Sequence, residues 1–196
     1  MQAKEFIKVA EKRIEKAVRS CKTDSRLVIA RYTAAISGNF QQWLAITFAR
    51  DVEANGIVLS NLNCEGQEDH RGMLLGFAKS CNTKPGDADR DHSEYEVQVI
   101  FDLLTNKKTR GLHGVALGAV LETTSKIFVP DLEKRARECG CTDFTYIEKH
   151  GEADIKHADE FLRALELEME AGYETPWDIA QHARHAAQQL IIKIFA

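Results

Sequence analysis

The stretch "EKHGEADIKHADEF", residues 148–161, contains three side chains that can bind a metal ion: His150, Asp154 and His157. They are spaced four and then three residues apart. Because an α-helix turns about 100° per residue, the three side chains would point within about 60° of one another on a helix. A solvated face in which His157 pairs with Asp154 would give the same pattern. A metal site therefore needs further ligands from elsewhere in the chain.

Glu122 is a second candidate, because it stands in the otherwise apolar run "VALGAVLETTSKIF". Burying a carboxylate is costly unless it is protonated, paired or metal-bound. The alternative is an exposed Glu122 that pairs with Lys126, one helical turn away. Gly114 and Gly118 share the stripe of Glu122. They would allow close helix approach, and they could also leave room for a small molecule.

Glu65 and His70 form a third candidate group, in "NLNCEGQEDHRG". Their five-residue separation would place them about 140° apart on one continuous helix. They can converge only if one helix ends near Gly66 and the next begins at His70. Glu68 competes with Glu65 for the same role. A polar surface turn is the alternative for the whole segment.

Taken together, the candidates are three carboxylates and three imidazoles from segments far apart in the sequence. Mixtures of imidazole and carboxylate suit iron or manganese, whereas thiolates suit zinc or copper(I). Two metal ions about 3.5–4 Å apart would use such a set, and facing helices of a bundle can supply it. The predicted metal ligands are Glu65, His70, Glu122, His150, Asp154 and His157.

The elements that would position these residues are helices. The chain has only three prolines and twelve glycines, and its apolar residues recur at spacings of three and four. No segment alternates as a strand would. We therefore predict one all-α domain over residues 1–196, a bundle of about seven to nine helices. The predicted helices cover residues 3–20, 25–36, 40–54, 55–66, 70–81, 92–104, 111–140, 143–171 and from 176 onward, with Pro130 inside the seventh.

Composition excludes several classes of function. The 196 residues are 44% hydrophobic and 29% charged, with a net charge of −4. No basic block favours nucleic acid, and no apolar run approaches the ~20 residues that a membrane span needs. The five scattered cysteines fit a reducing compartment and argue against a zinc or disulfide framework. We expect a cytoplasmic protein that acts on a small molecule, with a homodimer left open.

The motifs "NL..E", "LGAVLE" and "Y...H...D..H" resemble those of the haem-oxygenase-like diiron oxidases and oxygenases. That family includes relatives of the Chlamydia protein associating with death domains. It shares its all-helical fold with haem oxygenase, the TenA thiaminases and the PqqC-type oxidases. The resemblance covers about residues 55–165 and implies two iron ions, or a manganese and an iron, bound by the six residues above. It also implies O₂ as co-substrate and a small organic molecule as the species oxidised.

The resemblance also points to Tyr146, which matches a tyrosine near the metals in the p-aminobenzoate synthases of that family. Two features depart from the pattern. The gap from Glu65 to His70 is shorter than the usual seven residues, so the choice between Glu65 and Glu68 stays open. Leu121 stands where those synthases have a tyrosine, which weakens a self-sacrificing p-aminobenzoate synthesis.

Other functions remain to be separated. A metal-free enzyme of the TenA or PqqC type and a non-catalytic helical partner protein are both compatible with the fold. A TenA-like hydrolase needs a nucleophilic cysteine and a carboxylate, and no base is visibly positioned for Cys64 or Cys139. A haem oxygenase needs a histidine in its first helix, and no histidine precedes His70. Iron content and O₂ consumption distinguish the oxidase from all of these.

Overall fold

The computed structural model of the chain describes residues 3–50, 53–67, 69–106, 108 and 111–196. Over these residues the chain forms nine α-helices and no strand, which confirms the predicted all-α bundle. The helices are α1 (Ala3–Ser20), α2 (Ser25–Ile36), α3 (Asn39–Phe48), α4 (Asn55–Gln67), α5 (His70–Ser80), α6 (Asp87–Thr105), α7 (Leu112–Glu138), α8 (Thr145–Glu170) and α9 (Pro176–Ile194).

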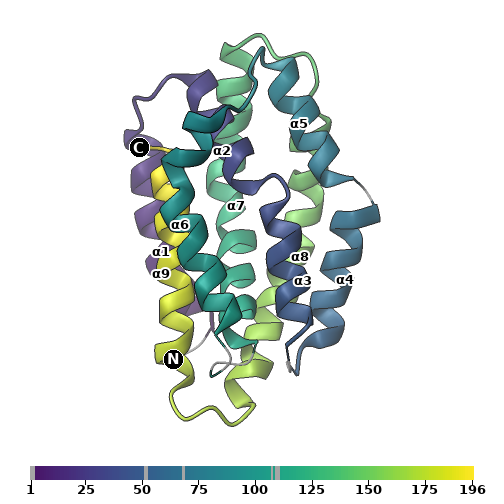
Figure 1. The fold of residues 1–196 in the computed structure, drawn as a ribbon, viewed down its shortest axis with the longest axis vertical. Coiled ribbons are helices and arrows are strands. Elements are labelled where there is room, and N and C mark those ends of the chain that lie inside the picture. Colours follow the sequence, from purple (N-terminus) through teal and green to yellow (C-terminus); the bar gives the residue numbers. More distant parts are fainter. Residues whose placement is uncertain (1–2, 51–52, 68, 107, 109–110) are drawn as a thin grey trace.

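Helix α7 runs through the centre of the bundle (Figure 1). Its N-terminal half is apolar on all sides, a pattern typical of a helix surrounded by others. Every residue from Leu112 to Ser125 is buried. It packs most extensively against α8 and α9, and α1, α2 and α3 also contact it. Glu122 therefore lies on the most enclosed helix of the fold.

Close packing along α7 depends on its glycines. A Cβ atom on Gly118 would lie 2.4 Å from Cε1 of Phe161 on α8, and one on Gly114 would lie 1.9 Å from Oγ1 of Thr47 on α3. The predicted close approach of neighbouring helices is thus confirmed. The expectation that these glycines leave room for a small molecule is wrong, because Phe161 and Thr47 fill that space.

Most helix ends follow the local signals. Helix α2 has the predicted bounds, and the Asp24 carboxylate accepts hydrogen bonds from the backbone N–H groups of Arg26 and Leu27. Gly140 and Gly172 follow α7 and α8 with positive φ angles of 73° and 80°, which glycine adopts without strain. Helix α8 begins at Thr145, with Phe144 as its N-cap, two residues after the predicted start at residue 143.

Two helix boundaries differ from prediction by five residues or more. Helix α3 ends at Phe48 instead of residue 54, and the N–H of Ala54 instead donates a 3.1 Å hydrogen bond to the Glu168 carboxylate of α8. Helix α6 begins at Asp87, five residues before the predicted start at His92. There the Asp89 carboxylate accepts a 2.8 Å hydrogen bond from the N–H of Gly86, so residues that resemble a loop begin the helix.

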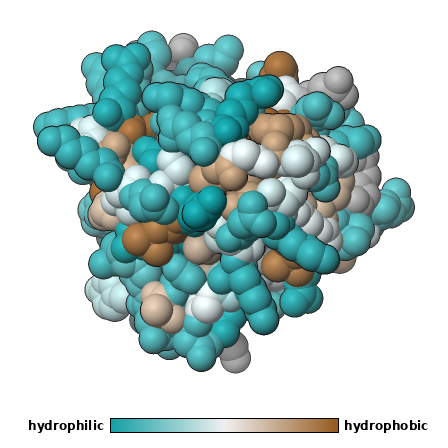
Figure 2. All heavy atoms as spheres, turned by 90° about the horizontal axis from the view of Figure 1, so that it is seen from above, coloured by the Kyte–Doolittle hydropathy of each residue, from teal (hydrophilic) through white to brown (hydrophobic). Residues whose placement is uncertain are grey.

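The face of the molecule in Figure 2 is mainly hydrophilic, and its hydrophobic residues form small separate patches. The described part of the chain has no helix long and apolar enough to span a bilayer. Its five cysteines are all free thiols.

Candidate metal centre

The six predicted ligands converge on one region where α4, α5, α7 and α8 meet, and they divide into two groups of three. Within each group, one potential ligand atom from every residue lies within 4.8 Å of the others. The first group, here called cluster 1, is Glu65, His70 and His150. The second group, cluster 2, is Glu122, Asp154 and His157. Helix α8 contributes to both clusters because His150 lies one to two turns before Asp154 and His157.

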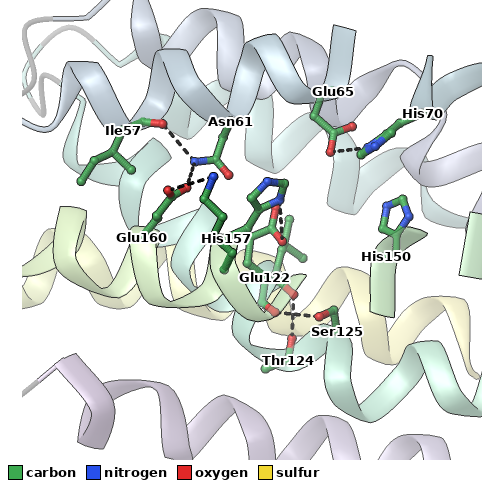
Figure 3. A network of polar contacts seen from close by, with 12 residues as sticks. Ile57, Asn61, Glu65, His70, Glu122, Thr124, Ser125, His150, His157 and Glu160 are labelled. Carbon is green, nitrogen blue, oxygen red and sulfur yellow. Dashed lines mark hydrogen bonds and ion pairs between the residues drawn. The ribbon is translucent and has the colours of Figure 1, made fainter. Parts of the chain in front are cut away.

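The end of α4 at Gln67 and the start of α5 at His70 bring Glu65 and His70 together. Asp69 adopts the left-handed conformation with φ of 47°, and its carboxylate accepts a 3.1 Å hydrogen bond from the N–H of Gly72. His70 therefore starts a new helix and turns back toward Glu65. Its Nδ1 lies 2.7 Å from the Glu65 carboxylate (Figure 3). The predicted break between two helices is confirmed, whereas the competitor Glu68 lies outside the described residues.

His150 completes cluster 1 from the opposite side. Its ring centroid lies 4.9 Å from that of His70. Its Nδ1 lies 2.9 Å from the backbone carbonyl of Tyr146, and because a carbonyl only accepts hydrogen bonds, Nδ1 carries the proton. Nε2 is then the nitrogen with a lone pair to offer. Such a hydrogen bond fixes the tautomer and orientation of metal-binding histidines in general.

Cluster 2 joins the central helix α7, which carries Glu122, to α8, which carries Asp154 and His157. His157 Nδ1 lies 3.8 Å from the Glu122 carboxylate, which is beyond hydrogen-bonding distance. Only 7% of Glu122 and 5% of His157 are exposed. The predicted alternative for Glu122 is wrong: it is buried, and Lys126 pairs with Glu11 of α1 at 2.7 Å.

Burial shifts the pKa of these groups toward their neutral forms. Burial, and then the charges of Asp154 and Glu65, hold the pKa of Glu122 well above its usual range. Burial raises the pKa of Asp154 to about 7 and lowers that of His150 to about 4. It also lowers the pKa of His157. The contact between His157 and Glu122 is therefore not a strong ion pair, and the buried carboxylates need a cation to hold their charges.

The donor set fits a pair of iron ions. Each cluster offers imidazole nitrogen and carboxylate oxygen, the ligands typical of non-haem iron. The negative charges of these carboxylates, two of which have a raised pKa, would be neutralised by divalent cations, and neutral histidines have a lone pair ready to donate. Among the described residues, no other group of three such side chains lies close enough together to hold a metal ion.

Sequence reasoning missed residues around the clusters. The hydroxyl groups of Tyr32 and Tyr146 are buried and lie 2.8 Å apart, and burial raises the pKa of both phenols. No local signal marks Tyr32. Asn61 donates a 3.1 Å hydrogen bond to the Glu160 carboxylate, one turn from His157 (Figure 3). Asn61 is the first residue of the "NL..E" motif, so the motif could have indicated that Asn61 lies near the site.

A small cavity of about 60 Å³ adjoins both clusters on the side of α2 and α5. Glu65, His150 and Asp154 line it together with Tyr32 and Tyr146. Its volume suffices for a few molecules the size of water. The site therefore combines buried, metal-capable side chains with a little internal space.

The fold and the site define an all-helical protein with a buried carboxylate–histidine centre suited to iron. Comparison with family models identifies the family: residues 30–190 match the model of the iron-containing redox enzymes, and the chain belongs to this family. The protein is accordingly an oxidoreductase of haem-oxygenase-like fold, from a family of iron-containing enzymes. No curated protein matches the chain.

Proposed function

We propose that the protein is a non-haem diiron oxidase or oxygenase that uses O₂ to oxidise a small organic substrate. The observation that carries the proposal is the division of six buried or partly buried candidate ligands into two adjacent clusters of equal size. Cluster 1 would hold one metal ion and cluster 2 the other, and a manganese ion in one position is compatible with the same ligands. Membership of an iron-containing redox family supports iron as the metal.

When bound, the metal pair would supply the electrons for reducing O₂, which is the electron acceptor, while the organic substrate is oxidised. The protein's own residues have three tasks. The clusters orient the ligand atoms, and the Tyr146 carbonyl keeps the proton of His150 on Nδ1. Apolar side chains such as Leu74 and Phe128 line the small cavity and limit the entry of water. Tyr146, whose ring centroid lies 4.0 Å from that of His150, is proposed to contact the reacting species.

Anaerobic loading of the metal-free protein with Fe(II) tests the proposal. We expect about two iron ions per chain, as a two-metal site requires, and O₂ consumption that depends on the bound iron. His70→Ala removes a ligand from cluster 1 only, and Asp154→Ala removes one from cluster 2 only. Each variant should retain about one iron ion per chain and lose O₂ consumption.

His185→Ala is the matched control, because His185 is an exposed histidine on α9 outside both clusters. It should bind iron as the unmodified protein does. Absence of specific iron uptake by the unmodified protein would contradict the proposal, and would favour a metal-free enzyme or a helical partner protein. A single iron per chain that only one of the two ligand variants abolishes would contradict the two-metal assignment.

A further inference from the structure

A second and much larger cavity reaches the same clusters from the side of α1. Its volume is about 590 Å³, within the range of sites that bind small organic molecules. Residues of α1, α7 and α8 line it. Glu122, His150 and Asp154 line both this cavity and the small one, so the clusters lie between the two. The large cavity therefore offers a route from the surface to the candidate metal centre.

The walls of the large cavity are mostly apolar. Ile7 of α1, Val129 of α7 and Leu162 of α8 all line it. Ile155 of α8 lines it as well, although 72% of this side chain is exposed. A large aliphatic residue so exposed beside a cavity provides apolar contact for a molecule that enters. An apolar body is thus the part of a ligand that these walls would bind.

A glycine keeps the cavity open next to the clusters. Gly151 lines it and directly follows His150, and a Cβ atom on Gly151 would meet no other atom within 4 Å. Ala158, seven residues later on the same face of α8, also lines the cavity. Helix packing does not require a residue without a side chain at Gly151, in contrast to Gly118. Gly151 is therefore a position where a larger side chain would enter the cavity without a steric clash.

Three lysines contribute to the charged part of the lining, and two of them lie at its α1 side. Lys4 and Lys8 are exposed, one helical turn apart on α1, and neither has an ion-pair partner among the described residues. Lys126 also lines the cavity but is paired with Glu11. Besides Glu122 and Asp154, the carboxylates in the lining are Glu11, which is neutralised by its pairing with Lys126, and Asp159. Two uncompensated lysines against one aspartate leave this end of the cavity with net positive charge.

We propose that the large cavity binds the substrate, and that the substrate is a small organic carboxylate with an apolar body. Its carboxylate lies near Lys4 and Lys8, and its apolar body extends along the cavity toward Glu122 and His150. The part of the molecule presented to the metal centre is then its apolar end rather than its acid group. The description of this ligand as a substrate rests on the proposed diiron function, whereas its binding to the cavity does not.

Binding to the metal-free, full-length protein tests the inference independently of iron. The probes are 4-phenylbutanoate, 4-phenylbutanol and 4-phenylbutylamine, which share one apolar body and carry a negative, neutral or positive head group. Isothermal titration calorimetry should show 4-phenylbutanoate binding most tightly. The Lys4→Gln/Lys8→Gln variant should bind it about fivefold more weakly, the effect expected of one or two exposed charge pairs. The affinity for the alcohol should not change.

The matched control for charge is Lys12→Gln/Lys16→Gln, which removes two exposed lysines one turn apart on α1 that do not line the cavity. Gly151→Phe should abolish binding of 4-phenylbutanoate by filling the cavity. Gly56→Phe is its control, because Gly56 lies on α4 away from the cavity and a Cβ atom there also meets nothing within 4 Å. Both controls should bind the probe as the unmodified protein does.

Three results would each overturn the inference: no binding of 4-phenylbutanoate, equal or tighter binding of the amine, or unchanged binding in Gly151→Phe. The iron measurement on the same protein separates this inference from the proposed function. Iron uptake without carboxylate binding removes only the substrate assignment. Carboxylate binding without iron uptake removes the diiron function and leaves the cavity as a carboxylate site.

Discussion

At the scale of single residues, Glu122 links stability to metal binding. It is a carboxylate on the central helix with only 7% of its surface exposed, and Asp154 and Glu65 lie near enough to raise its pKa. Ordinary core positions hold apolar residues, because an unpaired buried charge costs several kcal/mol. A carboxylate at such a position is costly in the metal-free protein and is compensated when a cation binds.

The substitution Glu122→Gln separates the effect of this carboxylate on stability from its effect on metal binding. Glutamine has nearly the same shape but no charge, so the metal-free variant should be more stable by about 1 kcal/mol. For a chain of this size, that corresponds to a rise in Tm of about 2–4 °C. The variant should also lose about one iron per chain. Thermal unfolding monitored by circular dichroism, with iron analysis of the loaded protein, measures both effects. A fall in the Tm of the metal-free variant would contradict this account.

The buried pair of tyrosine hydroxyls gives a second prediction at this scale. Tyr32→Phe leaves the Tyr146 hydroxyl buried without its 2.8 Å partner, and Tyr146→Phe does the reverse. Each single change should cost about 1–3 kcal/mol, because an unsatisfied buried hydroxyl is expensive. The double variant leaves neither hydroxyl and should cost less than the sum of the two. Denaturant unfolding in a double-mutant cycle measures the difference. Additive costs would show that the hydrogen bond contributes no coupling.

At the scale of elements, two helical glycines should respond in opposite directions to substitution by alanine. Gly118→Ala places a Cβ atom 2.4 Å from Phe161 and should destabilise the protein by about 1–3 kcal/mol through overpacking of α7 against α8. Gly56→Ala adds a Cβ atom in open space on α4 and should stabilise it by up to about 1 kcal/mol through helix propensity. Urea unfolding of both variants tests this. Similar responses would show that close packing does not determine the effect at Gly118.

The properties of individual helices also explain how much of the fold and of the site could be predicted from the sequence. Helical periodicity and short-range signals are local, so the bounds of α1 and α2 and the start of α5 at His70 could be predicted. The end of α3 could not, because a contact between Ala54 and Glu168 across 114 residues helps set the path of the chain there. Spacing on α8 predicted the stripe of His150, Asp154 and His157. Which three ligands share a cluster depends on the packing of four helices.

The large cavity could not be predicted from the sequence either, because it too depends on how distant helices pack. It depends on the face that α1 presents to α7 and α8, and α1 lies outside the segment that carries the family motifs. Lys4 and Lys8 look like solvated charges on an amphipathic helix, and no pattern in the sequence ties them to Glu122. Tyr32 was likewise missed, because only the packing of α2 against the rest of the bundle brings its hydroxyl to Tyr146.

At the scale of the whole molecule, the two clusters join separate parts of the chain. Cluster 1 connects α4 and α5 to α8, and cluster 2 connects α7 to α8. A metal ion held by ligands from different helices binds the folded state and not the unfolded chain. Such binding stabilises the fold by an amount that depends on the ratio of ligand concentration to Kd. The proposed metal centre should therefore hold the bundle together as well as carry the chemistry.

Anaerobic Fe(II) should raise the Tm of the whole protein. At a free concentration of about 100 times Kd, each ion contributes about 2.7 kcal/mol, or about 5–10 °C for a chain of this size. His70→Ala should retain about half of the increase, since cluster 2 remains intact, and the variant His70→Ala/Asp154→Ala should show none. Differential scanning calorimetry with Fe(II), and with Mg²⁺ as a control that histidine-containing sites disfavour, measures these shifts. An equal increase in the double variant would show that the iron binds elsewhere, and would separate the stability of the bundle from its two clusters.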